Sequence, residues 1–212
     1  MLREKVRRSL EAILTAVLFG TQTILNAGWA ISVMSMPLLL YLVYFLNGQA
    51  YPEREIQVLL FSKEFMVGRI IALIGLIVLL LAGVQFLWNR AREVGLIKTG
   101  AYSAVRHPQF TGIIIVTIGL TVMVLTNGGV RQQEIAGLWL IQILGYIGIA
   151  RYEETYLLKQ FGDDFRQYKR DVPFLFPIKC PHCIPETLFT ILILALISCF
   201  LLFFPYDLIR IR

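Results

Sequence analysis

Five uncharged stretches constrain this chain more than any other feature of its sequence. They contain 41, 20, 24, 16 and 20 residues, and they run from Glu11 to Glu53, Arg69 to Arg90, Arg106 to Arg131, Glu134 to Arg151, and Glu186 to Asp207. A helix needs about 20 largely apolar residues to cross a bilayer. Only helices and closed barrels satisfy their backbone polar groups there. The sequence therefore predicts an all-α, polytopic integral membrane helical bundle.

The composition excludes the soluble classes of protein. Apolar residues make up 57% of the chain and charged residues 16%, whereas an ordinary soluble domain carries about 25% charged residues. The net charge is +6. In so apolar a chain, an excess of Lys and Arg is typical of loops that lie against anionic lipid headgroups. We therefore expect membrane lipids as partners, and no nucleic acid.

The first uncharged stretch leaves the number of spans open. Residues 12–52 could form a hairpin that turns near Asn26-Ala27-Gly28, or one span followed by an interfacial or re-entrant segment broken at Pro37. With an odd number of crossings, 14 of the 20 Lys and Arg residues lie on one side, whereas a hairpin divides them 10 and 10. The positive-inside rule favours the odd number. We predict five spans with a cytoplasmic N-terminus, and six as the alternative.

A short turn, Asn127-Gly128-Gly129, joins two of the later stretches and predicts an antiparallel helical hairpin. This hairpin would bring Arg106-His107-Pro108 close to Arg151-Tyr152-Glu153-Glu154 at one membrane surface. Pro108 suits the first turn of a helix, and a helix N-terminus with an Arg and a His can bind an anionic group. Interfacial anchors that meet lipid phosphates are the alternative. The two glutamates would be either solvated charges or ligands of a cation.

The chain after Arg151 is polar but carries large apolar side chains at helical spacing. They are Phe161, Phe165, Tyr168 and Val172, and Gly162 between them would kink or end the helix. This pattern predicts an amphipathic helix, which could simply lie on the headgroups. No metal is expected, because Cys180 and Cys183 lack a second ligand pair at zinc spacing.

Two blocks of residues carry a resemblance to a known family. Leu96 to Gly112, with Gly100, Tyr102 and Arg106-His107-Pro108-Gln109-Phe110, resembles the signature of the isoprenylcysteine carboxyl methyltransferase and phospholipid methyltransferase superfamily. A second block resembles the C-terminal signature of that superfamily: Glu153-Glu154, Phe161-Gly162-Asp163-Asp164-Phe165, Tyr168 and Val172-Pro173. Both blocks occur in the expected order, and the resemblance covers about residues 70–177.

The resemblance implies an integral membrane enzyme that uses S-adenosyl-L-methionine to methylate a lipid-linked or apolar acceptor, through a carboxylate or an amine, in a pocket on the cytoplasmic face. The membrane would be the cytoplasmic membrane of a prokaryote or the endoplasmic reticulum of a eukaryote. Carried over position by position, the cofactor-binding residues are Val94, Gly95, Leu96, Ile97, Tyr102, His107, Pro108, Gln109, Phe110 and Glu153.

Three further residues receive roles. Arg106 would raise the local potential, and Glu154 would act as general base for an amine or hydroxyl acceptor. Arg151 would meet a substrate carboxylate, because Ile149 stands where the prenylcysteine enzymes carry an Arg. The resemblance also divides the chain into an N-terminal anchor region (1–69), a methyltransferase core (70–177), and a linker with the CPHC sequence and a final transmembrane helix (178–212).

Two departures and two alternatives accompany this prediction. Ala101 replaces a common Pro, and Phe110 replaces the usual Tyr and so removes a hydroxyl. Membrane-bound sterol or lipid reductases share a similar C-terminal pattern and would use NADPH instead. A non-catalytic membrane assembly protein could be built on the same fold. The methyl acceptor and the oligomeric state are left open at this point.

Overall fold

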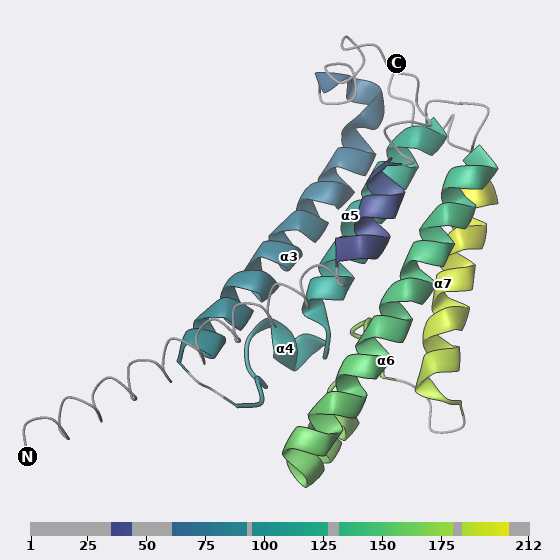
Figure 1. Ribbon diagram of the computed structural model, residues 1–212. Coiled ribbons are helices and arrows are strands. Elements are labelled where there is room, and N and C mark those ends of the chain that lie inside the picture. The colour runs from purple at the N-terminus through teal and green to yellow at the C-terminus, as the bar shows by residue number, and fades with distance from the viewer. Residues whose placement is uncertain (1–34, 44–60, 93–94, 127–131, 180–183, 204–212) are drawn as a thin grey trace, which may run out of the picture.

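The protein is helical throughout the part of the chain that its structure describes. This computed structural model describes residues 35–43, 61–92, 95–126, 132–179 and 184–203, and its first described segment, 35–43, is helical (Figure 1). The remaining elements are η1 Lys63–Phe65, α3 Met66–Ala91, α4 Ala101–Ala104, α5 Pro108–Thr126, α6 Gln132–Asp171 and α7 Glu186–Phe203. The described residues contain no strand, and the predicted all-α fold is confirmed.

Four helical segments are long and apolar enough to cross a membrane. They are Lys63–Ala91, Pro108–Thr126, Glu134–Asp171 and Glu186–Phe203, and they coincide with the last four uncharged stretches. The predicted multi-pass membrane bundle is therefore confirmed. The choice between five and six spans stays a prediction, because 35–43 is the one part of 12–52 that is described. The expected turns at 26–28 and 127–129 also lie outside the described residues, and the division at 69 and 177 stays a prediction.

The four long helices pack in the order α3, α5, α6 and α7, with α5 between α3 and α6 (Figure 1). The most apolar window of α5 is 72% buried inside the protein, compared with 11% for that of α3. Leucines along α3, such as Leu73, Leu80 and Leu87, are more than half exposed. An apolar surface of this size is stable against lipid and not against water. The α3 helix therefore faces the bilayer, and α5 forms the centre of the bundle.

Glycines bring α3 and α5 into backbone contact. A Cβ atom built at Gly75 would lie 2.8 Å from the carbonyl oxygen of Gly112, and one at Gly112 would lie 2.6 Å from the backbone nitrogen of Leu79. One at Gly119 would lie 2.5 Å from the carbonyl oxygen of Gly68. Since the hydrophobic effect does not drive helices together inside lipid, such small residues allow the close van der Waals packing that does. This contact fixes α5 against α3.

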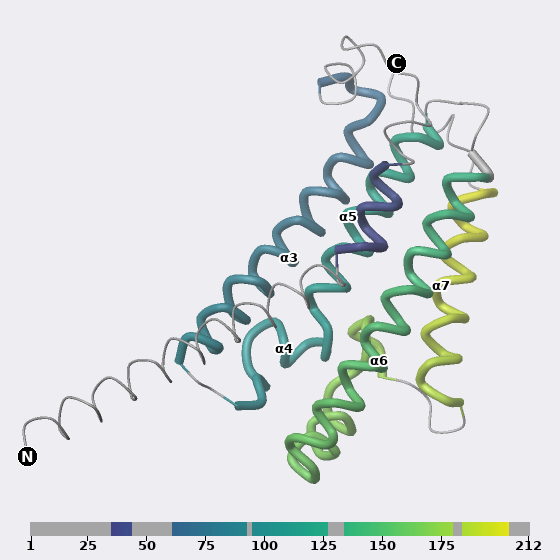
Figure 2. The backbone as a smooth tube through the Cα atoms, viewed as in Figure 1, coloured from purple at the N-terminus to yellow at the C-terminus, as the bar shows by residue number. Residues whose placement is uncertain are grey.

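The 40 residues of α6 form two helical segments that meet at Gly162, and the first of them, 132–161, is about 45 Å long at 1.5 Å per residue, which exceeds the thickness of the hydrocarbon core. Gly162 has φ 52° and ψ −119°, and the predicted kink at this residue is confirmed. Beyond it the chain turns back toward α4 and α5 (Figure 2), where the Tyr168 hydroxyl donates to the Tyr102 carbonyl at 2.6 Å. Phe165 and Tyr168, from the predicted apolar stripe, are buried in the protein itself. At these two positions the stripe packs on protein and not on lipid headgroups.

Candidate active site

The start of α5 fixes the two residues that precede it. The helix begins at Pro108, as predicted, and the backbone N–H groups of Phe110 and Thr111 both donate to the His107 carbonyl at 3.1 Å. Proline at this first position sacrifices no helical hydrogen bond, because its N–H would have had no partner there. Arg106 and His107 are consequently held at the mouth of the helix, and their exposed fractions are 3% and 2%.

The segment that follows α6 packs against this helix start. The backbone N–H of Arg106 donates to the carbonyl of Pro173 at 2.9 Å, and the Thr111 hydroxyl donates to the carbonyl of Leu175 at 2.6 Å. These two bonds tie the end of the second signature block to the first block. The Phe174 ring between them contacts the His107 ring, edge to face, with 5.4 Å between the ring centroids.

A cluster of buried charges joins α5, α6 and α7. Arg106 Nη1 lies 3.1 Å from Glu154 Oε1, and Arg106 Nη2 is ion-paired with Glu186. The other carboxylate oxygen of Glu154, Oε2, lies 2.8 Å from Arg151 Nη1 and 2.9 Å from Lys169 Nζ. The side chains of Arg106 and Glu154 are 1% and 4% exposed. These ion pairs confirm the predicted proximity of Arg106 to the glutamates that follow the helical hairpin.

The Arg106 guanidinium is close to carboxylates but poorly hydrogen-bonded. Among the described residues, none of its three side-chain nitrogens has a partner in hydrogen-bond geometry, and neither has Oε1 of Glu154. Buried charges without such bonds are costly. A bound ligand or an ordered water is the usual reason for such unsatisfied polar atoms in a native site.

The His107 imidazole lies between two carboxylates. Its Nδ1 is 3.3 Å from Glu153 Oε2, and its Nε2 is 3.6 Å from Glu154 Oε1, although neither contact reaches hydrogen-bond geometry. Burial by itself would lower the pKa of His107, but the interactions with Glu153 and Glu154 together outweigh it and raise this pKa above its usual value. The site therefore favours a protonated His107.

An open pocket lies beside this cluster and measures about 410 Å³ when the solvent space at its mouth is included. Its walls are formed by Gly95, Leu96, Ile97, Tyr102, Arg106, Glu153, Leu157 and Tyr168. Burial, followed by the neighbouring charge of Glu153, raises the pKa of Tyr102, so its phenol is neutral. The pocket thus combines two aromatic rings, aliphatic side chains, one buried cation and one carboxylate.

Six of the 13 predicted site residues line this pocket. Those in its wall are Gly95, Leu96, Ile97, Tyr102, Arg106 and Glu153. The other described residues of the predicted set are not part of its wall: His107, Pro108, Gln109, Phe110, Arg151 and Glu154. Phe110 is fully buried and stacks on His107, with 5.7 Å between their ring centroids. Val94 lies outside the described residues, and the functional roles of all these residues stay predictions.

The loop that leads to Tyr102 is held by a residue that the sequence did not single out. Gly100 has φ 60°, where a side chain is strained, and a Cβ atom there would lie 2.5 Å from the Gln85 amide. The Gln85 side chain accepts from the Ala101 N–H at 2.9 Å and donates to the Thr99 carbonyl. Leu157 and Tyr168 in the pocket wall, and Lys169 and Glu186 in the charge cluster, were likewise not predicted as site residues.

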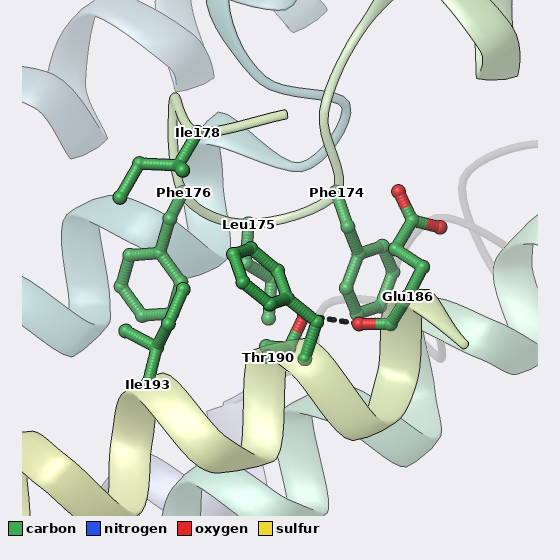
Figure 3. Close-up of a pocket in the computed structure, with 8 residues that line it drawn as sticks. Phe174, Leu175, Phe176, Ile178, Glu186, Thr190 and Ile193 are labelled. Carbon is green, nitrogen blue, oxygen red and sulfur yellow. Dashed lines mark hydrogen bonds between the residues drawn. The ribbon is translucent and has the colours of Figure 1, made fainter. Parts of the chain in front are cut away.

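A second, smaller cavity lies on the other side of Phe174. It measures about 210 Å³ including the space at its open mouth, and it lies between the 174–178 segment and α7 (Figure 3). Its walls are Phe174, Leu175, Phe176, Ile178, Glu186, Phe189, Thr190 and Ile193. The space inside it suffices for about one water molecule. Glu186 belongs both to the wall of this cavity and to the charge cluster, so the two adjoin each other.

Fold and site together define the class: an integral membrane protein of several helices, with a buried ionic cluster and an open pocket at one end of the bundle. The chain belongs to the family described as "protein of unknown function (DUF1295)", whose model matches residues 22–172. The two signature blocks fall almost entirely within this range.

A second comparison gives a more distant relative. Over 90 residues the chain is 34% identical to a protein-S-isoprenylcysteine O-methyltransferase of Schizosaccharomyces pombe, which covers 42% of this chain and 36% of that protein. The chain thus spans about a third of the length of the curated relative that it matches. This match confirms the resemblance to the isoprenylcysteine methyltransferases. No solved structure matches the chain.

Proposed function

We propose that this protein is an S-adenosyl-L-methionine-dependent methyltransferase that acts on a lipid-linked or apolar acceptor at the cytoplasmic membrane face. The observation that carries the proposal is the composition of the pocket wall. Leu96, Tyr102 and Arg106 come from the first signature block, and Glu153 and Tyr168 come from the second. The similarity to an S. pombe protein that is named as a methyltransferase supports the same activity.

The residues of the pocket fit this cofactor. Arg106 and His107 carry buried side-chain nitrogens without a hydrogen-bond partner among the described residues, and Glu153 carries such an oxygen. Arg106 and a protonated His107 would attract the carboxylate of the cofactor, and Glu153 would accept from its ammonium or ribose hydroxyls. The Tyr102 ring would face the sulfonium in a cation–π contact worth about 0.5–2 kcal/mol. Backbone groups of 94–97 would meet the adenine.

The chemistry supplied by the bound cofactor would be an electrophilic methyl group for an in-line displacement. The contribution of the chain would be to hold both reactants in line and to exclude water. Alignment of this kind can account for about 7–11 kcal/mol of a reaction barrier. Leu157 and the Tyr168 ring line the pocket as its water-excluding surfaces. No buried group needs to gain or lose a proton for this role.

The surroundings of Glu154 favour a carboxylate acceptor over an amine. Glu154 is in contact with Arg106, Arg151 and Lys169, and three cations stabilise its ionised form, which makes it a weak proton acceptor. A carboxylate acceptor needs no base. Arg151 faces Glu154, Glu186 and the Phe174 ring and is absent from the pocket wall. Its absence from the wall argues against the predicted role of Arg151 as the counter-charge of such an acceptor.

The proposal is tested by calorimetric titration of the purified full-length protein with S-adenosylhomocysteine and, separately, with NADPH. We expect micromolar binding of S-adenosylhomocysteine by the wild type and its loss in Glu153→Ala, because that substitution removes the carboxylate in the pocket wall. Asp163→Asn is the matched control, since it alters a carboxylate on the same helix whose side chain is 92% exposed. This control should bind like the wild type.

The other outcomes separate the alternatives. Binding of NADPH without S-adenosylhomocysteine would assign the protein to the reductases and overturn the proposal. Binding of neither nucleotide by the folded protein would favour the non-catalytic alternative. Unchanged affinity in Glu153→Ala would leave a methyltransferase but remove Glu153 from its cofactor site.

A further inference from the structure

The first residue of the last helix reaches the charged site from outside the family match. The family match ends at residue 172, and α7 begins at Glu186. Glu186 is nevertheless ion-paired with Arg106 through Oε1, and its Oε2 lies 3.4 Å from Arg151 Nη2. The neighbouring Thr187 hydroxyl accepts a hydrogen bond from Arg151. The start of α7 therefore binds both arginines of the cluster.

The charges of the cluster show why a second carboxylate is needed. Glu154 alone is shared by Arg106, Arg151 and Lys169. One carboxylate cannot neutralise three cations, and an uncompensated charge that is 1% exposed, like the Arg106 side chain, is strongly destabilising. The carboxylate of Glu186 supplies a second negative charge to Arg106 and Arg151, from a helix other than the one that carries Glu154.

Glu186 lies between the first turn of its own helix and the ring of Phe174. It lies in the first turn of α7, where the helix dipole favours a carboxylate. Its backbone carbonyl accepts from the Thr190 hydroxyl at 2.8 Å, and Figure 3 shows it beside Phe174. The Phe174 ring also lies 5.4 Å below the Arg106 guanidinium carbon. The guanidinium is thus fixed by Glu186, Glu154 and Phe174 from different elements.

We propose that Glu186 is a positioning residue that holds the Arg106 guanidinium in the pocket wall. Helix α7 thereby contributes a carboxylate to the site. The inference rests on the proposed function, because it concerns the affinity of the pocket for the cofactor. Glu186 is absent from the pocket wall and therefore acts through Arg106.

The test is calorimetric titration of the full-length protein in lipid nanodiscs with S-adenosylhomocysteine. Glu186→Gln keeps the shape of the side chain and removes its charge, and it should weaken binding about tenfold, as expected for loss of a close charge pair. Glu186→Asp restores a carboxylate and should recover affinity to within about threefold of the wild type. Asp163→Asn, which removes an exposed carboxylate outside the cluster, is the matched control, and it should leave affinity unchanged.

A double-mutant cycle separates positioning from general support of the fold. In an Arg106→Gln background, Glu186→Gln should change affinity less than about threefold, because residues that act through one another are non-additive. A full additional loss in the double variant would show that Glu186 acts independently of Arg106 and would overturn the inference. Wild-type affinity in Glu186→Gln would overturn it as well.

The same measurements distinguish this inference from the proposed function. If the wild-type protein binds S-adenosylhomocysteine and Glu186→Gln binds it equally well, the positioning role fails and the methyltransferase proposal stands. If the folded wild-type protein does not bind S-adenosylhomocysteine, both fail.

Discussion

At the scale of single residues, the site depends on charges that are removed from water. Arg106 and His107 are adjacent in sequence and almost fully buried, yet they face different partners. Arg106 is permanently charged and contacts Glu154 and Glu186. His107 can lose its charge, and it contacts Glu153 and Glu154. His107 is thus the member of this adjacent pair whose charge depends on pH near neutrality.

We predict that the stability of the protein falls as pH rises, because of His107. Its pKa is raised in the folded protein by the two carboxylates, above the value of about 6.5 of an unperturbed imidazole. Its stabilising contribution is therefore complete below about pH 6.5 and is lost as pH rises through the folded pKa. Thermal unfolding measured between about pH 6 and pH 9 should show this loss in the wild type and a flatter profile in His107→Gln.

The comparison of the wild type with His107→Gln isolates the contribution of the His107 imidazole. The sequence has two histidines, and the second, His182, is present in both proteins. Parallel profiles for the wild type and His107→Gln would show that the two carboxylates do not favour protonation of His107.

At the scale of elements, the kink in α6 allows one helix to serve two purposes. Its first part crosses the membrane, and its second part turns back so that Phe165 and Tyr168 pack beside the pocket. A straight helix would carry Lys169 away from Glu154, with which it is paired at 2.9 Å. Gly162 is where this change of direction takes place, with φ 52°.

We predict that Gly162→Ala destabilises the protein by about 1–3 kcal/mol, the usual cost of a non-glycine residue in a forbidden backbone region. The cost is purely conformational, because a Cβ atom at this position would meet nothing within 4 Å. Gly148→Ala on the same helix is the matched control. It has equal space and ordinary helical geometry, so it should be neutral or stabilising by up to about 1 kcal/mol. Equal thermal unfolding of both variants would contradict a strained kink.

At the scale of the whole molecule, the site lies at one end of the bundle, and the distribution of Lys and Arg predicts which side of the membrane that end faces. We predict that Asp163→Cys, made in a chain whose three natural cysteines are replaced, reacts with a membrane-impermeant thiol reagent from the cytoplasmic side. Lys63→Cys, at the start of the segment Lys63–Ala91 and the opposite end of α3, should react from the other side. The reverse labelling pattern would contradict the predicted orientation.

The spans were predictable from the sequence for a simple physical reason. A bilayer excludes charge, so each crossing appears as an uncharged stretch. The hairpin of α5 and α6 likewise made the proximity of Arg106 to Glu154, and of His107 to Glu153, predictable, since it is a consequence of chain connectivity. The role of Glu186 in the cluster was not predictable, because it depends on how α7 docks against α6. The backbone contact of α3 with α5 was not predicted. Glycines within an apolar stretch do not by themselves indicate which helix they will pack against.

The ion pair between Arg106 and Glu186 also has a consequence for biosynthesis. About 80 residues of chain separate the two partners, and at about 5–20 residues per second a ribosome needs several seconds or more to make them. Until α7 has been made and inserted, Arg106 lacks one of its two carboxylates. Helix α7 therefore completes the charge cluster, and a nascent chain halted before it would leave Arg106 with Glu154 as its carboxylate partner.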